Sequence, residues 1–205
     1  MQFLELKTRL SNFLIFSTKD IEKIDSAFHS QRLSEWQEKK YIRKIKGRYY
    51  LFSDLEINES VLFLIANKIY SPSYVSLEMA FSYYNLIPES VYGITSVTSK
   101  KTNNFKTDFG EFIYRHIKSE LMFGYKLVKY GNHNFRIAEI EKAILDYFYL
   151  NSHLKTENDF TEIRFDEKEF KVLVDRNKLN RYLAVFNNKS LEKRMKRFLN
   201  YIDYA

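Results

Sequence analysis

Four ionisable residues have the chemical types that a metal-dependent nuclease uses, namely Asp108, Glu139, Glu141 and Lys142. In such an enzyme, carboxylates hold the cation and a lysine stabilises the attacked phosphate. However, Glu139 begins an apolar-periodic segment, where acidic residues also interact favourably with the amino-terminal end of a helix dipole. The structural explanation is therefore favoured, and we expect neither catalytic residues nor a metal site.

The other usual catalytic and metal-binding patterns are missing from the sequence. The histidines are scattered, at His29, His116, His133 and His153. None has the HxxxH or HxxE spacing of metal ligands. The sequence has no Walker lysine motif, GxGxxG or GxSxG, and no cysteine for a disulfide or a thiolate site. We therefore expect a protein that is not an enzyme and needs no cofactor.

Basic residues in the first quarter of the chain indicate a different chemistry, the binding of phosphate groups. The net charge is +7, and residues 1–52 hold eleven Lys or Arg against six Asp or Glu. In "IRKIKGRYYLF", two alternating apolar runs meet at Lys46-Gly47, and Gly47 permits the positive φ of a tight turn. The residues expected to face outward are Arg43, Lys44, Lys46 and Arg48. This predicts a basic β-hairpin, for which the ordinary alternative is a solvated sheet edge.

Three predicted helices precede this hairpin. Apolar residues recur at helical spacing from Phe3 to Phe13, and Ser17 with Asp20 forms a capping-box pattern at the start of a second helix. A third helix is expected to end near Lys40. Three helices and a hairpin, in this order, are typical of a winged helix-turn-helix.

We therefore predict a winged helix-turn-helix DNA-binding domain over residues 1–53. Its third helix would enter the major groove while the hairpin follows the phosphate backbone. Glu35 and Glu38 would repel phosphates, so the contacts are assigned to the start of the helix and to the hairpin. The predicted DNA-binding residues are Ser30, Gln31 and Arg32 on the helix, and Lys44, Lys46 and Arg48 on the hairpin.

Residues 54–205 are predicted to form a second domain, so that the whole chain is α+β. Its expected elements are mixed helices and antiparallel strands, with a helical C-terminal end. Ser76 is expected to cap a short helix after Pro72, and Asn85 to end that helix in a left-handed conformation. Strands are expected from Val91 to Ile137.

The segment from Lys189 to Arg197 contains five Lys or Arg and one Glu. It is either a terminal helix with a solvated basic face or a second contact for DNA or RNA. Elsewhere, no apolar run approaches the roughly 18 residues of a membrane span. The start, "MQFLELKTRL", lacks the pattern of a signal peptide. These features predict a cytoplasmic protein.

Three segments together resemble the AbiEi-type antitoxins of bacterial type IV toxin–antitoxin (abortive infection, phage-defence) systems. They are "RLSEWQEKKYIRKIKGRYYLF", "SPSYVSLEMAFSYYNLIPESVYGITSVTSKKTNNFKTDFGEFIYRHI" and "IAEIEKAILDYFYL", in the family's order. The resemblance covers roughly residues 30–150. Lys40 and Asn85 stand where glycine is common in that family.

The resemblance implies two activities. The N-terminal domain would bind inverted repeats in double-stranded promoter DNA and repress its own operon, and the C-terminal domain would counter a nucleotidyltransferase-like toxin. Whether that toxin is bound directly is left open. The alternative is a transcriptional regulator or protein-interaction module that neutralises its partner by direct binding.

Overall fold

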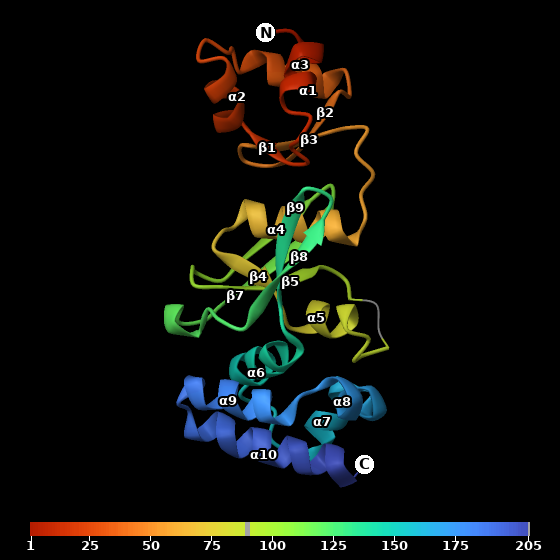
Figure 1. Cartoon of the computed structure of the whole chain (residues 1–205), viewed down its shortest axis with the longest axis vertical. Coiled ribbons are helices and arrows are strands. Elements are labelled where there is room, and N and C mark those ends of the chain that lie inside the picture. Colours follow the sequence, from red (N-terminus) through yellow and green to blue (C-terminus); the bar gives the residue numbers. More distant parts are fainter. Residues whose placement is uncertain (89–90, 205) are drawn as a thin grey trace.

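The computed structural model describes residues 1–88 and 91–204. The chain is α+β, as the sequence predicts. It is elongated, with the N-terminal elements at one end, a sheet in the middle and helices at the other end (Figure 1). Within the described residues, no helix combines the length and the apolar character that crossing a bilayer requires.

The N-terminal part consists of helices packed on a small antiparallel sheet. Its elements are α1 (Phe3–Arg9), β1 (Phe16–Ser17), α2 (Thr18–Ile24), α3 (Gln31–Glu38), β2 (Ile42–Lys46) and β3 (Tyr49–Phe52), with the strands in the order β1-β3-β2. The predicted capping box is confirmed, because Ser17 N–H donates to Asp20 Oδ2 at 2.8 Å. The buried side chains of this part include Leu6, Phe16, Leu33, Trp36, Ile42 and Tyr50.

The β2–β3 hairpin belongs to two apolar cores. Ile42 and Tyr50 lie in the N-terminal core, whereas Ile45 and Leu51 lie in the larger core of the remaining chain. The register shifts between Lys44 and Lys46, which marks a bulge. The hairpin is therefore enclosed on both faces at its base.

The middle of the molecule is a sheet, called here the central sheet, with helices on its faces. The elements are α4 (Glu59–Ile69), β4 (Ser73–Val75), α5 (Glu78–Tyr83), β5 (Ile94–Thr98), β6 (Asn103–Thr107), β7 (Gly110–His116), the 3-10 turn η1 (Ser119–Leu121), β8 (Tyr125–Tyr130) and β9 (His133–Ala138). The strand order is β6-β7-β5-β4-β9-β8.

Two predictions for this region are wrong. The sheet is not antiparallel throughout, since β4 pairs with β9 and β5 pairs with β7 in parallel. Ser76 does not cap a helix: it is fully buried, and α5 begins after Leu77 instead. The cause is the three-residue strand β4, which was not predicted and which lies immediately before Ser76. The left-handed conformation of Asn85 is confirmed, with φ of 57°.

The C-terminal elements are α6 (Ile140–Leu150), α7 (Glu157–Ile163), α8 (Glu167–Leu173), α9 (Arg176–Phe186) and α10 (Lys189–Tyr204). They pack through an aromatic cluster that includes Phe148, Phe160, Phe165, Phe170 and Phe198. Helix α6 joins this bundle to the central sheet (Figure 1).

Candidate nucleic-acid interface

Helix α3 presents a polar face to solvent. Its exposed residues follow helical spacing, at Gln31, Ser34, Glu35 and Glu38, while Leu33 and Trp36 are buried on the opposite side. Ser30, immediately before the helix, is also exposed. Two of the three predicted helix residues, Ser30 and Gln31, are therefore free to meet a ligand.

Arg32, the third predicted residue, has a structural partner. It is half-buried, and its guanidinium Nη1 donates to the backbone carbonyl of Met1. The Met1 amino group in turn lies 3.3 Å from Asp25 Oδ2. Arg32 thus holds the start of the chain against α3, a role for which the sequence carries no local signal.

The tip of the β2–β3 hairpin is exposed, as predicted. Lys44, Lys46 and Arg48 are all exposed around Gly47, which has φ of +55°. Arg48 Nη2 donates to Tyr49 Oη at 3.4 Å. This hydrogen bond is the largest influence raising the pKa of Arg48, and the carboxylates of Asp20 and Glu22 add to it.

Two hairpin cations lie over aromatic rings of the β6–β7 hairpin. Lys46 Nζ is 4.1 Å from the centre of the Phe105 ring, and Arg43 Cζ is 4.7 Å from that of Phe109. Such contacts contribute about 0.5–1 kcal/mol each at exposed sites. Among the described residues, the Lys44 side chain makes no hydrogen bond, ion pair or ring contact. The basic tip is therefore fixed against the central sheet rather than free-standing.

The residues considered for a nuclease do not form one site. Asp108 is exposed in the β6–β7 turn. Glu141 is buried and accepts from Asp175 N–H at 3.0 Å. Lys142 is fully buried and forms an ion pair with Asp146. Within residues 1–88 and 91–204, no three Asp, Glu, His or Cys side chains gather as metal ligands would.

Lys142 and Asp146 form a buried polar cluster that the sequence analysis missed. Tyr74 Oη and Ser76 Oγ donate to Asp146 Oδ2 at 2.9 and 3.0 Å. Burial lowers the pKa of Lys142 and raises that of Asp146, and the attraction between them opposes both shifts. Spacing of four residues on a helix is typical of exposed pairs, so the burial of this pair could not be read from the sequence.

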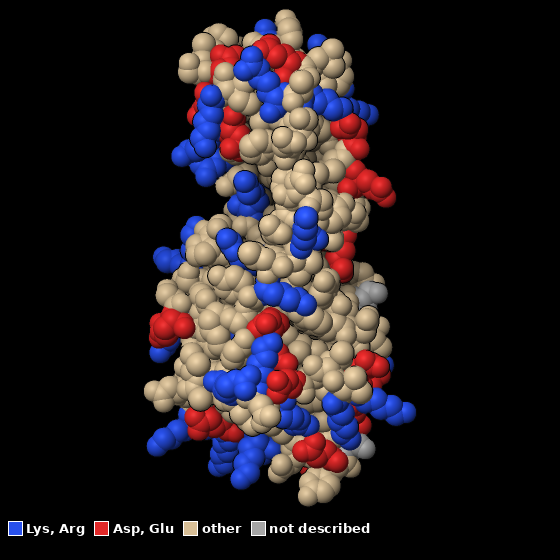
Figure 2. Space-filling model, viewed as in Figure 1, with Lys and Arg blue, Asp and Glu red and all other residues tan. Residues whose placement is uncertain are grey.

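The basic C-terminal segment does not present one continuous charged face. Lys189, Lys193, Lys196 and Arg197 are exposed, and Figure 2 shows Lys and Arg side chains gathered at this end of the molecule. Arg194 is buried, where its Nη2 donates to the Phe148 carbonyl at 2.9 Å. One of the five cations is thus part of the packing of α10 on α6.

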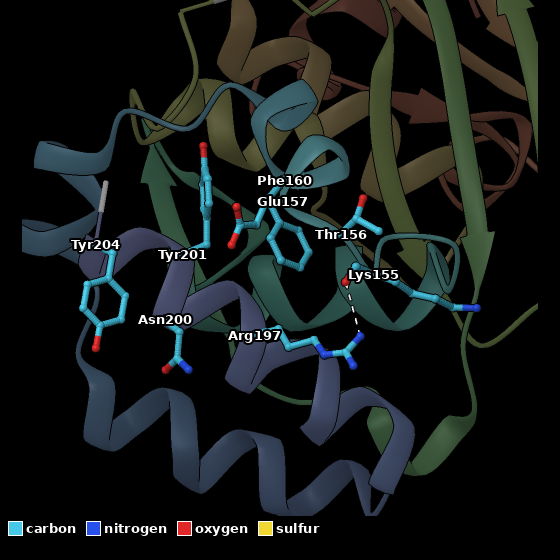
Figure 3. Close-up of a pocket in the computed structure, with 8 residues that line it drawn as sticks. All are labelled: Lys155, Thr156, Glu157, Phe160, Arg197, Asn200, Tyr201 and Tyr204. Atoms are coloured by element: carbon cyan, nitrogen blue, oxygen red, sulfur yellow. Dashed lines mark hydrogen bonds between the residues drawn. The ribbon is translucent and has the colours of Figure 1, made fainter.

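A hollow of about 700 Å³ lies between α7 and α10 (Figure 3). Phe160, Tyr201 and Tyr204 supply aromatic rings, and Arg197 Nη1 lies 3.5 Å from the Lys155 carbonyl oxygen. Glu157 also lines the hollow, and the Lys155 side chain extends away from it (Figure 3). One guanidinium beside a carboxylate makes this a weaker site for an anion than the N-terminal surface.

No protein-family model matches this chain, and no curated protein is significantly similar to it. What can be inferred about function therefore comes from the surfaces described above and from the resemblance of the three quoted segments.

Proposed function

We propose that this chain is a DNA-binding autorepressor and antitoxin of the AbiEi type. The observation that carries the proposal is the element order α1-β1-α2-α3-β2-β3 in residues 1–53, with the sheet in the order β1-β3-β2. This order supports a winged helix-turn-helix, in which a helix reads base edges and a hairpin contacts phosphates.

The exposed groups support a division of labour on this surface. Ser30 and Gln31 would face base edges from the start of α3, and Lys44, Lys46 and Arg48 would meet phosphates from the hairpin tip. The ring contact of Lys46 leaves its side chain exposed, so the charge stays available while its position is restricted. Restricting a contact residue before binding reduces the entropy lost on association.

The carboxylates on α3 limit how the helix can approach DNA. Glu35 and Glu38 lie on the same exposed face as Gln31, one and two turns further along. Phosphates close to them would be repelled. We therefore propose that the amino-terminal end of α3 points into the groove and that its carboxyl-terminal end remains outside.

The antitoxin half of the proposal concerns residues 54–205 and rests on the sequence resemblance. Its functional partner would be a nucleotidyltransferase-like toxin encoded beside it. The chain would act by binding and not by catalysis, without a cofactor. Growth of cells that express the neighbouring gene, with and without this chain, tests this half separately from DNA binding.

The test of DNA binding is a gel-shift titration with the duplex upstream of the gene over a salt series. We expect Lys44→Ala with Lys46→Ala to reduce the log–log salt slope by roughly 0.9 per lost phosphate contact. Lys168→Ala with Lys171→Ala, on exposed positions of α8 at the other end of the molecule, is the matched control for charge. Equal slopes for both double variants would refute the hairpin assignment.

A protein-interaction module is the second candidate, favoured by the exposed pair Glu35 and Glu38 on α3. Acidic groups there suit a basic protein surface better than a nucleic acid. Co-purification with the neighbouring gene product at high salt, lost in Glu35→Lys with Glu38→Lys, would favour this candidate over DNA binding.

A further inference from the structure

A cleft of about 590 Å³ lies where the N-terminal part meets the central sheet. Three segments form its walls: Leu14, Ile15 and Tyr49 from the N-terminal part, the carboxyl-terminal half of α4, and the β8–β9 hairpin. Figure 1 shows this hairpin reaching toward the N-terminal sheet. A molecule in the cleft would touch both parts of the chain at once.

The ionisable side chains that line the cleft, apart from that of Tyr49, are basic. Lys68 extends from α4, and His133 and Arg136 come from β9. No carboxylate belongs to the described lining. The charge of Asp20 attracts Lys68, but hydrogen bonds from Ser17 already hold that carboxylate. The lining therefore carries positive charge and no carboxylate of its own, and Asp20, outside the lining, offsets part of that charge.

Arg136 is the residue that most clearly lacks a partner. Its backbone is fixed on both sides by Asn67, which accepts from Arg136 N–H and donates to the Arg136 carbonyl. Its side chain is half-buried, yet in the described part of the chain the guanidinium has no ion pair or hydrogen bond. A guanidinium taken partly out of water ordinarily has a carboxylate or phosphate partner, which it holds in bidentate fashion.

We infer that this cleft binds a phosphate-bearing ligand, with Arg136 and Lys68 holding the phosphoryl oxygens. Asn134 and Ser71 lie in the same lining and can donate further hydrogen bonds, while Tyr49 and the apolar wall contact the rest of the ligand. The site is separate from the proposed reading face of α3. Because its walls come from both parts of the chain, occupancy would stabilise the packing of the N-terminal part on the central sheet.

The phosphoryl group has two sources, a small molecule or the backbone of bound DNA. Isothermal titration of the full chain with sodium pyrophosphate, at constant ionic strength, tests the first. We expect saturable binding that weakens about tenfold or more in Arg136→Gln and Lys68→Gln, because each variant loses a charge-assisted hydrogen bond to the phosphoryl group. Arg136→Lys should keep part of the affinity.

Lys129→Gln is the matched control, because Lys129 is exposed on the same β8–β9 hairpin but lies outside the cleft lining. A gel shift with upstream DNA tests the second source. Loss of DNA affinity in both cleft variants, without pyrophosphate binding, would assign the phosphoryl group to DNA. Binding of neither probe, or equal binding by wild type and both variants, would overturn the inference. Pyrophosphate binding does not depend on DNA recognition, so the two proposals fail independently.

Discussion

The ammonium group of Lys46 lies 4.1 Å from the centre of the Phe105 ring. The two residues belong to different sheets, so this contact joins the basic hairpin to the β6–β7 hairpin of the central sheet. Arg43 and Phe109 repeat the arrangement at 4.7 Å. The position of the basic tip is thus set by residues far away in the sequence.

The coupling between Lys46 and Phe105 can be measured by a double-mutant cycle. We expect Lys46→Met and Phe105→Leu to show an interaction free energy of about 0.5–1 kcal/mol in urea unfolding, since the ring quadrupole attracts the ammonium. The matched pair Lys44→Met and Phe105→Leu should be additive, because Lys44 does not contact that ring. Additivity in both cycles would mean that the contact contributes nothing to stability.

Gln31 and Arg32 are adjacent but should behave differently. Gln31→Ala removes an exposed side chain, so we expect a free energy of unfolding within roughly 0.5 kcal/mol of wild type, with specific DNA binding weaker by roughly 1–3 kcal/mol. Arg32→Gln should lower the free energy of unfolding by about 1–2 kcal/mol, because it loses the bond to the Met1 carbonyl. Urea unfolding and binding to specific and scrambled duplexes separate the two effects. An Arg32→Gln protein with the same free energy of unfolding as wild type would contradict the structural role of Arg32.

The buried pair Lys142 and Asp146 should respond asymmetrically to substitution. Asp146→Asn leaves the ammonium of Lys142 buried without its counter-charge, which costs about 3–5 kcal/mol of stability. Lys142→Met should cost less stability, because Asp146 keeps its donors Tyr74 and Ser76. Burial also raises the pKa of Asp146, which favours its neutral form. Chemical denaturation of both variants decides this. A larger loss for Lys142→Met than for Asp146→Asn would contradict the expectation.

The lowered pKa of Asp20 predicts that the stability of the fold depends on pH. Burial alone would raise its pKa, but hydrogen bonds from the Ser17 hydroxyl and N–H outweigh this and hold the pKa below its ordinary value of 3.8. A depressed carboxyl pKa stabilises the fold above the unfolded-state value, and this stabilisation is lost as the pH falls through the folded-state value. Asp20→Ala should cost about 1 kcal/mol at pH 7.

The difference between wild type and Asp20→Ala should shrink as the pH falls below about 4. Unfolding curves from pH 7 to pH 2.5 measure it. Glu22→Ala, an exposed neighbour on α2, is the control and should show no comparable trend. A difference that stays constant over this range would show that the cap does not depend on the carboxylate charge.

Structural features that depend on neighbouring residues could be predicted from the sequence. The capping box at Ser17 and the left-handed Asn85 were readable because each depends on residues within a few positions. The helix over 140–150 was readable from its apolar period. Strand β4 was not, because three residues between two helical patterns carry too little periodicity, and its parallel pairing with β9 depends on residues more than sixty positions away.

The missed parts of the candidate sites are long-range contacts of charged residues. Lysine and arginine usually lie on the solvated surface. However, Lys142, Arg194 and Arg32 each bond to a buried or half-buried partner elsewhere in the chain. Arg136 was correctly expected to lie in a strand region. That its surroundings in the cleft contain no carboxylate becomes visible only when three segments come together. Charge patterns along a sequence do not record which side chains the fold encloses.

The β2–β3 hairpin, with Ile42 and Tyr50 on one side and Ile45 and Leu51 on the other, makes the two halves of the chain thermodynamically dependent on each other. Cutting the polypeptide after Ser53 would expose apolar surface on both fragments. Heating the intact chain should accordingly unfold it in one cooperative step, and the excised N-terminal fragment should aggregate.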